Sequence, residues 1–331
     1  MLGCPRAMGL GDWAAMALTL SGVAACGAEP QFRRPTPQEA LKFLKALPRV
    51  WRNTRDFDPK APSKKILIQL WENFTVEDLK TLKVVHPGGH VDDPDAPGRF
   101  SRRHLRVKPS DWRYFTVFEQ AEAFEAFHDM EGITDECFFY LGKLPQSVTR
   151  IHLAMSEATG EGVKHLRSLK NLKALNLLLS RTIGDVALVH AGDIASLEHI
   201  DVNGCPRITG SGVAALSKLK NLKVLKIGGC SLSDASLANF RALSIEELDL
   251  SDNVAEWVIK YRGGGQHRFT VSFAGLKSLL ASRGSLPNLK RLIVRRGANL
   301  RGGGKPVTKA ELLTDAQRAQ LAKLRPGLQV K

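Results

Sequence analysis

The sequence has few cysteines, and after its first thirty residues it has no segment apolar enough to cross a membrane. The five cysteines are widely spaced and odd in number, which excludes a disulfide framework, and no Cys-X-X-Cys pair is present. No histidine lies at a metal-like spacing from a cysteine pair, and no nucleophile comes with an orienting partner. We therefore expect neither an enzyme nor a bound cofactor or metal.

Acidic residues are also in short supply, with 33 Asp and Glu against 48 Lys and Arg. The imbalance lies at the two ends: the net charge is +8 over residues 30–110 and +13 over residues 254–331, but −5 over residues 111–253. Basic ends could contact phosphate, acidic lipid or acidic glycan, whereas a solvated surface that keeps the chain soluble is the simpler interpretation. Nothing indicates specific recognition of a nucleic acid.

Residues 1–29 differ in composition from the rest and are predicted to be a signal or lipoprotein leader. Their apolar run, Trp13 to Ala25, is too short to span a bilayer. The segment "VAAC" at Val23–Cys26 resembles the lipobox of bacterial lipoproteins, and that resemblance implies lipidation of Cys26. We expect an exported or cell-envelope protein, membrane-bound only through such an anchor. The alternative is a cytoplasmic protein with a poorly ordered N-terminus.

The middle of the chain repeats an apolar triad, at positions one, four and six of a short segment. Successive copies start 24, 25, 25, 23 and 44 residues apart, at Val148, Leu172, Leu197, Leu222, Ile245 and Leu289. The long last gap contains either an insertion near 254–270 or a degenerate repeat. A weaker copy is predicted to start at Phe124, and the tail from Gln320 is interpreted as a closing half-repeat.

Position nine of each copy is small and polar: Ser156, Ser180, Cys205, Cys230 and Asn253. This pattern resembles the leucine-rich repeat, L-x-x-L-x-L-x-x-N/C-x-L. The link "ITGSGVAALSKLKNLK" resembles the cysteine-containing subclass found in F-box proteins. The resemblance implies an α/β solenoid, with a curved parallel sheet on the concave side, helices on the convex side and helical caps.

On this basis we assign residues 120–300 to the repeats, 30–119 to an N-terminal cap or degenerate repeats, and 301–331 to a C-terminal cap. In each unit the apolar triad faces the core, and a helix follows, such as residues 211–219 with Val213, Leu216 and Leu219 on one face. Ser211 is expected in the N-cap region of this helix. Cys205 and Cys230 share one phase of adjacent units and should stack as buried thiols.

The flanking regions contain two patterns with alternative interpretations. Residues 86–104 are predicted to be a loop in which His86, His90, Asp92 and Asp93 could resemble metal ligands, although a solvated loop is the simpler interpretation. Glycine triplets at 263–265 and 302–304, flanked by Arg and Lys, could bind an anion or form basic loops. Helices are predicted over 37–47 and 75–85, and a strand near 64–71.

The exposed strand face is the expected functional surface, because a stack of strands offers a broad surface and no deep pocket. Its predicted partner-binding residues are Arg150, His152, Asn176, His199, Asp201, Lys226, Glu247, Asp249, Arg291 and Arg295. We predict a module that binds an unknown protein. The alternatives are an intracellular substrate adaptor, for which no F-box is readable, binding of an acidic polymer or membrane surface by the basic ends, and acid–base chemistry by His152, His199 and Asp201.

Overall fold

The structure is a computed structural model that divides into two compact units, residues 1–33 and 34–331, and the features below belong to the second. It describes residues 32–47, 50–53, 66–69, 74–85, 87, 90–92, 100–126, 130–251, 257–260, 266–269, 271–294 and 313–331. Several sequence predictions fall outside these ranges and stay predictions: Cys26, His86, Asp93, Asn253, Arg295 and both glycine triplets.

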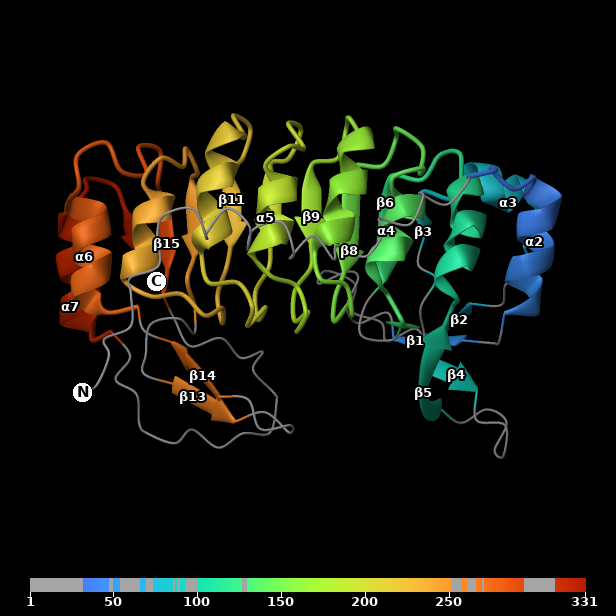
Figure 1. Cartoon of the computed structure of the whole chain (residues 1–331), viewed down its shortest axis with the longest axis horizontal. Coiled ribbons are helices and arrows are strands. Elements are labelled where there is room, and N and C mark those ends of the chain that lie inside the picture. Colours follow the sequence, from blue (N-terminus) through green and yellow to red (C-terminus); the bar gives the residue numbers. More distant parts are fainter. Residues whose placement is uncertain are drawn as a thin grey trace, which may run out of the picture. The chain divides into compact units, whose positions relative to one another are not determined.

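The main element is a sheet of nine strands, all parallel, with strand order β3-β6-β8-β9-β10-β11-β12-β15-β16. The order follows the sequence, so each strand pairs with the strand of the preceding and the following unit (Figure 1). The strands are Val84–Val85, Ala123–Ala126, Arg150–Leu153, Ala174–Asn176, His199–Asp201, Val224–Lys226, Glu247–Asp249, Arg291–Ile293 and Gln329–Val330.

The predicted apolar triads form the core of this sheet. At position four, Ile151, Leu175, Ile200, Leu225 and Leu248 are direct partners in successive strands, and each is at most 2% exposed. Positions one and six are buried in every copy as well. The alignment of these side chains in one buried column confirms the phase assigned from the sequence, since a one-residue slip would turn the column to solvent.

The weak copy predicted to start at Phe124 is wrong by three residues. Phe124 is the register partner of Ile151 and so occupies position four, and the true triad is Ala121, Phe124 and Ala126. A large apolar side chain is typical of position one, which is why the pattern favoured Phe124 there. In this unit positions one and six are alanines, and their small side chains leave space for the Phe124 ring at position four. The sheet also begins before residue 120, because Val85 in β3 pairs with Phe124.

Among the described residues between β6 and β15, six helical segments lie side by side along the sheet (Figure 1). Two α-helices alternate with two 3₁₀ helices, and a third 3₁₀ helix and a third α-helix follow. The segments are α4 (Asp135–Leu141), η4 (Glu161–Ser168), α5 (Asp185–Ala191), η5 (Ser211–Lys218), η6 (Ala235–Phe240) and α6 (Phe273–Ala281). The residue spacing of three in "VAALSKL" matches the three residues per turn of a 3₁₀ helix.

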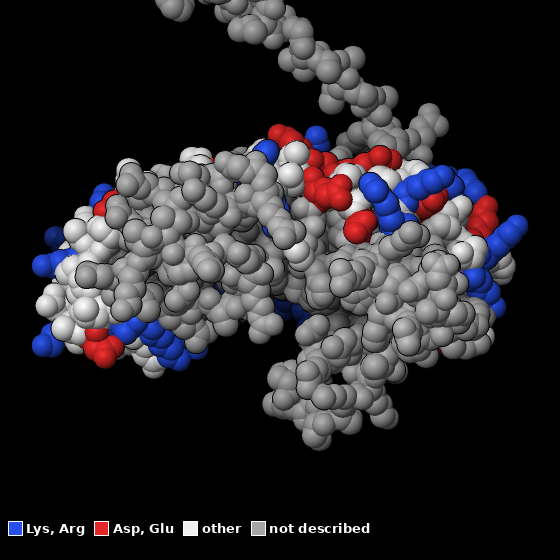
Figure 2. All heavy atoms as spheres, turned by 90° about the horizontal axis from the view of Figure 1, so that it is seen from below, with Lys and Arg blue, Asp and Glu red and all other residues white. Residues whose placement is uncertain are grey.

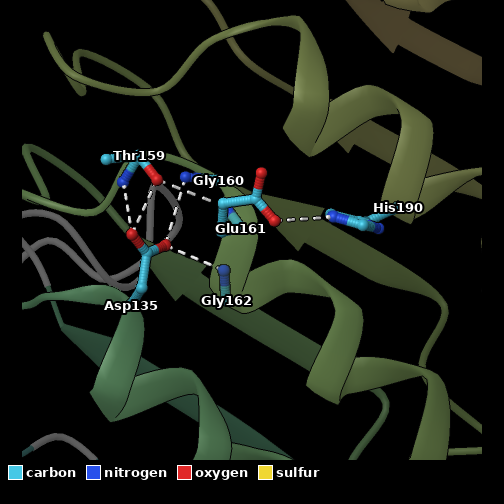
Figure 3. Close-up of polar contacts among 6 residues, drawn as sticks. All are labelled: Asp135, Thr159, Gly160, Glu161, Gly162 and His190. Atoms are coloured by element: carbon cyan, nitrogen blue, oxygen red, sulfur yellow. Dashed lines mark hydrogen bonds and ion pairs between the residues drawn. The ribbon is translucent and has the colours of Figure 1, made fainter. Parts of the chain in front are cut away.

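Helices α4 and α5 each begin with an aspartate that caps the 3₁₀ helix of the next unit. The Asp135 carboxylate accepts from the backbone N–H groups of Thr159, Gly160 and Gly162 at 2.8–3.2 Å, and from the Thr159 hydroxyl at 2.7 Å (Figure 3). Asp185 repeats this arrangement fifty residues later, on Thr209, Gly210 and Gly212. These bonds satisfy the free amides at the start of each 3₁₀ helix.

Ser211, expected in the N-cap region, is the first residue of η5, and its side chain does not cap the helix. The N-cap residue is Gly210, with φ of +90°, and no side chain of its own segment caps the helix. Glycine is needed here for the left-handed backbone. It is also needed two residues on, because a Cβ on Gly212 would clash with the Asp185 carbonyl oxygen, just as one on Gly162 would lie 2.7 Å from the Asp135 carbonyl oxygen.

The capping bonds also affect the carboxyl groups themselves. Burial acts to raise the pKa of Asp135 and Asp185, but the hydrogen bonds outweigh it and the pKa of both lies below the usual value. The stabilisation from each ionised group is therefore present above the unfolded-state pKa of about 4 and is lost as the pH falls through the lower folded-state value.

The N-terminal end of the sheet is covered by an aromatic cluster. Helix α2 (Pro37–Ala46), which has a complete capping box at Thr36, packs on the 3₁₀ helix η3 (Pro109–Val117). From η3, the rings of Trp112 and Phe115 lie 5.5 and 5.8 Å from that of Phe124. The cluster closes off the apolar column at β6. Helix α3 (Val76–Thr81) leads into β3.

A second sheet occupies part of the region predicted to be a loop. Its order is β2-β1-β4-β5-β7, built from Ile66–Gln69, Val50–Asn53, His90–Asp92, Phe100–Arg106 and Met130–Glu131. The loop predicted over 86–104 is thus wrong where β4 and β5 form. The proline and glycine content of this segment predicted a loop throughout, but such a composition does not exclude short strands.

The long gap before the last repeat contains an insertion, as one of the two interpretations held. Strands β13 (Trp257–Lys260) and β14 (Gln266–Phe269) form a separate antiparallel pair, while β12 pairs directly with β15. The insertion therefore adds no strand to the parallel sheet.

At the C-terminal end, α7 (Asp315–Lys323) begins at Thr314 with a capping box and leads to β16. The Arg325 guanidinium donates to the carbonyl groups of Leu280, Ser285 and Leu286, and this holds the closing segment to the α6 turn. In the part of the chain that the structure describes, no helix is both long and apolar enough to cross a membrane.

We predict that Asp185→Ala lowers the free energy of unfolding by about 2 kcal/mol, because it leaves the first amides of η5 without acceptors. Urea denaturation followed by circular dichroism measures the change. The matched control is Asp193→Ala, which removes an exposed ion pair to Lys218 and should cost much less. Equal losses in the two variants would contradict the capping role.

Candidate functional site

The strand face is the side of the parallel sheet that carries positions three and five of each unit. At position three, Arg150, His199 and Arg291 are exposed, whereas the residues between them are partly exposed: Ala174, Val224 and Glu247. At position five, Asn176, Asp201 and Lys226 are half-buried and Asp249 is buried. Position three is therefore the part of the predicted site that a partner can reach most easily.

Three polar side chains at position five bond to their own strand ends. Asn176, Asp201 and Asp249 each accept a hydrogen bond from the backbone N–H two residues later, at 2.8–3.0 Å. These are Asx turns, which cap the amides that the strands leave free where they end. The sequence marked these residues as partner contacts, but their short side chains are already engaged in holding the fold.

Acidic and basic residues of the strand face differ in exposure. Three ion pairs cross between neighbouring strands: Arg150–Glu125 at 3.7 Å, Lys226–Asp201 at 3.9 Å and Arg291–Glu247 at 2.8 Å. In these pairs the basic side chains are 58, 40 and 48% exposed, and the acidic ones only 12, 19 and 13%. Long basic side chains extend past the carboxylates that pair with them. The face therefore presents mainly positive groups to solvent.

A row of alternating charges lies beside this face, at position two. Glu198 accepts from Lys223 at 2.7 Å and lies 3.2 Å from Lys173 on the other side, and Lys290 pairs with Glu246 at 3.0 Å. The two lysines lower the pKa of Glu198. Because each charge lies opposite one of the other sign on the next strand, the row favours the observed register over a shifted one.

Burial shifts the pKa of two groups on the strand face in the direction that disfavours charge. It raises the pKa of Asp201, against the lowering effects of the Asn203 amide and of Lys226. It lowers the pKa of His152 to about 4, so this imidazole is neutral at pH 7. His152 lies between Glu125 and Asn176 in the register of the sheet.

The structure does not bring together the three residues considered for acid–base chemistry. His199 and Asp201 are both on β10, but His152 is on β8, and β9 lies between the two strands. Two strand spacings separate them by about 10 Å, beyond direct proton transfer. Among the described residues, no three His, Cys, Asp or Glu side chains converge as a metal site requires.

The repeat cysteines are buried, as predicted. Cys205 and Cys230 are fully buried, and each thiol donates to a backbone carbonyl of the preceding strand, Leu177 at 3.2 Å and Val202 at 3.3 Å. Burial raises the pKa of Cys205 to about 12, and that of Cys230 is also raised. The earlier units use Ser156 and Ser180 in the same phase, joined by a hydroxyl–hydroxyl bond of 3.0 Å.

The end of the strand face carries an exposed apolar side chain in an unfavourable backbone conformation. At position eight the units require a positive φ, which Gly204 and Gly229 supply without strain. Met155 adopts φ of +59° at this position although it is not glycine, and it is 47% exposed. The spacing of the apolar triads did not identify Met155 as a special position. The glycines at position eight of later units, Gly204 and Gly229, do indicate a positive φ there.

Figure 2 shows acidic side chains gathered in one area of the surface that it draws, with basic side chains next to them.

No known family model matches this chain, and no curated protein gives a significant sequence match. The case for a function therefore comes from the residues and their geometry.

We predict that Cys137, Cys205 and Cys230 do not react with Ellman's reagent in the folded protein. A pKa of about 12 for Cys137 and Cys205 lowers the thiolate fraction about a thousandfold, and burial blocks access. The measurement uses a Cys4→Ser, Cys26→Ser variant, so that only these thiols remain. Reaction of all three thiols with the reagent before urea is added would show that these cysteines are accessible in the folded protein.

We also predict that His152 makes the protein less stable as the pH falls from about 6.5 toward 4. In this window the unfolded imidazole binds a proton but the folded one, with a pKa of about 4, does not. Urea denaturation at pH 6.5 and pH 5 should show a smaller difference for His152→Gln than for the parent. His199→Gln, which retains His152, should keep the parental difference.

Proposed function

We propose that this protein is a leucine-rich repeat solenoid that binds another protein through its strand face. The main support is the register of the parallel sheet, which forms one continuous row from these residues: Arg150, Ala174, His199, Val224, Glu247 and Arg291. A row built from successive units is wide and open, and such a surface suits a macromolecule better than a small substrate.

The shape of this row supports the same interpretation. The small side chains of Ala174 and Val224 lie on either side of the exposed His199, and longer exposed groups stand at Arg150 and Arg291, the two ends of the row. Met155, at the end of β8, adds an exposed apolar contact next to the charged row. Apolar and arginine side chains together are common at protein interfaces.

The placement of the protein outside the cytoplasm is part of the proposal and rests on the leader-like residues 1–29. If Cys26 is lipidated, the strand face would act at a membrane surface, with the partner in the cell envelope. Mass spectrometry of the mature N-terminus tests this: a start at Cys26 supports it, and an intact Met1 supports the intracellular adaptor.

A steric block of the strand face should abolish partner binding. We expect Ala174→Trp with Val224→Trp to reduce recovery of partners in a pull-down from the native host at least about tenfold, because two indoles would cover the row on both sides of His199. The control is Lys164→Trp with Lys220→Trp, two exposed positions away from the strand face. Thermal denaturation checks that each variant is folded.

The same proteins recovered with both variants, in equal amounts, would rule out this face as the binding surface. Asp201 and Asp249 are unsuitable for the test, because both side chains accept backbone hydrogen bonds. Their replacement would change the stability of the fold together with any binding.

A further inference from the structure

We propose that the partner's contact region is an acidic, extended protein segment that lies across the strands, with its carboxylates on Arg150, Lys226 and Arg291. This inference rests on the proposed function and adds the chemistry of the partner.

The exposed charge of the strand face is positive although its composition is mixed. Glu125, Asp201 and Glu247 are 12–19% exposed, and Asp249 is 8% exposed. The basic partners of the first three are 40–58% exposed. An approaching surface therefore meets ammonium and guanidinium groups first, and a basic partner would have to displace them before it reached a carboxylate.

The basic groups keep hydrogen-bond capacity for a second acid. Arg291 contacts Glu247 through Nε, and Arg150 contacts Glu125 through one Nη nitrogen at the long distance of 3.7 Å. A guanidinium has five N–H donors, so the ion pairs leave most of them for a carboxylate of the partner. Lys226 lies 3.9 Å from Asp201, which is an ion pair without a short hydrogen bond.

The strand order fixes the spacing of these three groups. Arg150 is on β8, Lys226 on β11 and Arg291 on β15, which are three and five strands apart in the sheet. At about 4.8 Å per strand, Lys226 and Arg291 lie about 14 and about 24 Å from Arg150 across the sheet, and Lys226 is also displaced by two residues, about 7 Å, along the strand direction. An extended peptide advances about 3.4 Å per residue, so acids at residues 1, 5 and 8 of a segment would meet them in turn.

The test measures binding of a fluorescein-labelled peptide of twelve residues, with Glu at its second, sixth and ninth positions and Asp, Ser and Gly elsewhere, by fluorescence anisotropy. The face variant carries Arg150→Gln, Lys226→Gln and Arg291→Gln. The matched control carries Lys164→Gln, Lys220→Gln and Lys277→Gln, which removes the same charge from exposed positions away from the strand face.

We expect the face variant to bind the peptide about tenfold more weakly than the parent, and the control variant to bind within about twofold of it. Affinity for the parent should fall steeply between 50 and 300 mM salt. No binding by the parent, equal weakening in both variants, or binding unaffected by salt would each overturn the inference. Equal weakening would instead show that the peptide responds to the overall positive charge of the protein and not to the strand face.

Two further probes separate other anions from an acidic protein. Heparin and phosphatidylglycerol vesicles are titrated with the same variants, and a face-dependent loss for either one that exceeds the loss for the peptide overturns the inference. A pull-down of the native partner with the tryptophan and glutamine variants distinguishes the acidic-segment proposal from the proposed function. If the tryptophan variant loses it and the glutamine variant keeps it, the acidic chemistry is wrong and the proposed function stands.

Discussion

No unit of this protein can bury its own apolar side chains or satisfy its own backbone, and every other feature depends on this constraint. A strand of three residues has hydrogen-bond partners only in the units before and after it. The amides at the start of η5 find their acceptor in Asp185, a residue of the preceding unit. Stability is therefore a property of neighbouring pairs, and the ends need separate closure, which the aromatic cluster at Phe124 and the guanidinium of Arg325 provide.

The capping aspartates follow a second period, which is two units long. Asp135 and Asp185 lie fifty residues apart, as do the Thr-Gly-X-Gly segments that they cap at 159–162 and 209–212. The first four helical segments alternate between α and 3₁₀ form with the same period, which follows from the chemistry: one unit donates the carboxylate and the next needs glycine to receive it. At Asp234 the pattern continues in reduced form, on the backbone and hydroxyl of Ser272.

Side-chain length determines which charges of the strand face reach solvent. A carboxylate at position five is short enough to turn back to its own strand end, as Asp201 and Asp249 do, whereas Lys226 and Arg291 extend beyond the neighbours that they pair with. A surface of mixed composition thereby becomes basic toward solvent. The same geometry keeps His152 half-buried and neutral, so that charge is confined to the outer part of the face.

The sequence by itself determined the phase of the repeat, the buried column from Ile151 to Leu292 and the burial of Cys205 and Cys230, because regular spacing of apolar residues is a local property that neighbours only reinforce. It could not place Phe124 correctly, since the two small residues around it matter only once the strands are stacked. Only the tertiary structure decided which charges reach solvent and which aspartates cap a neighbouring helix. Both depend on what the adjacent unit places within a few ångströms, and a single unit's sequence does not contain that information.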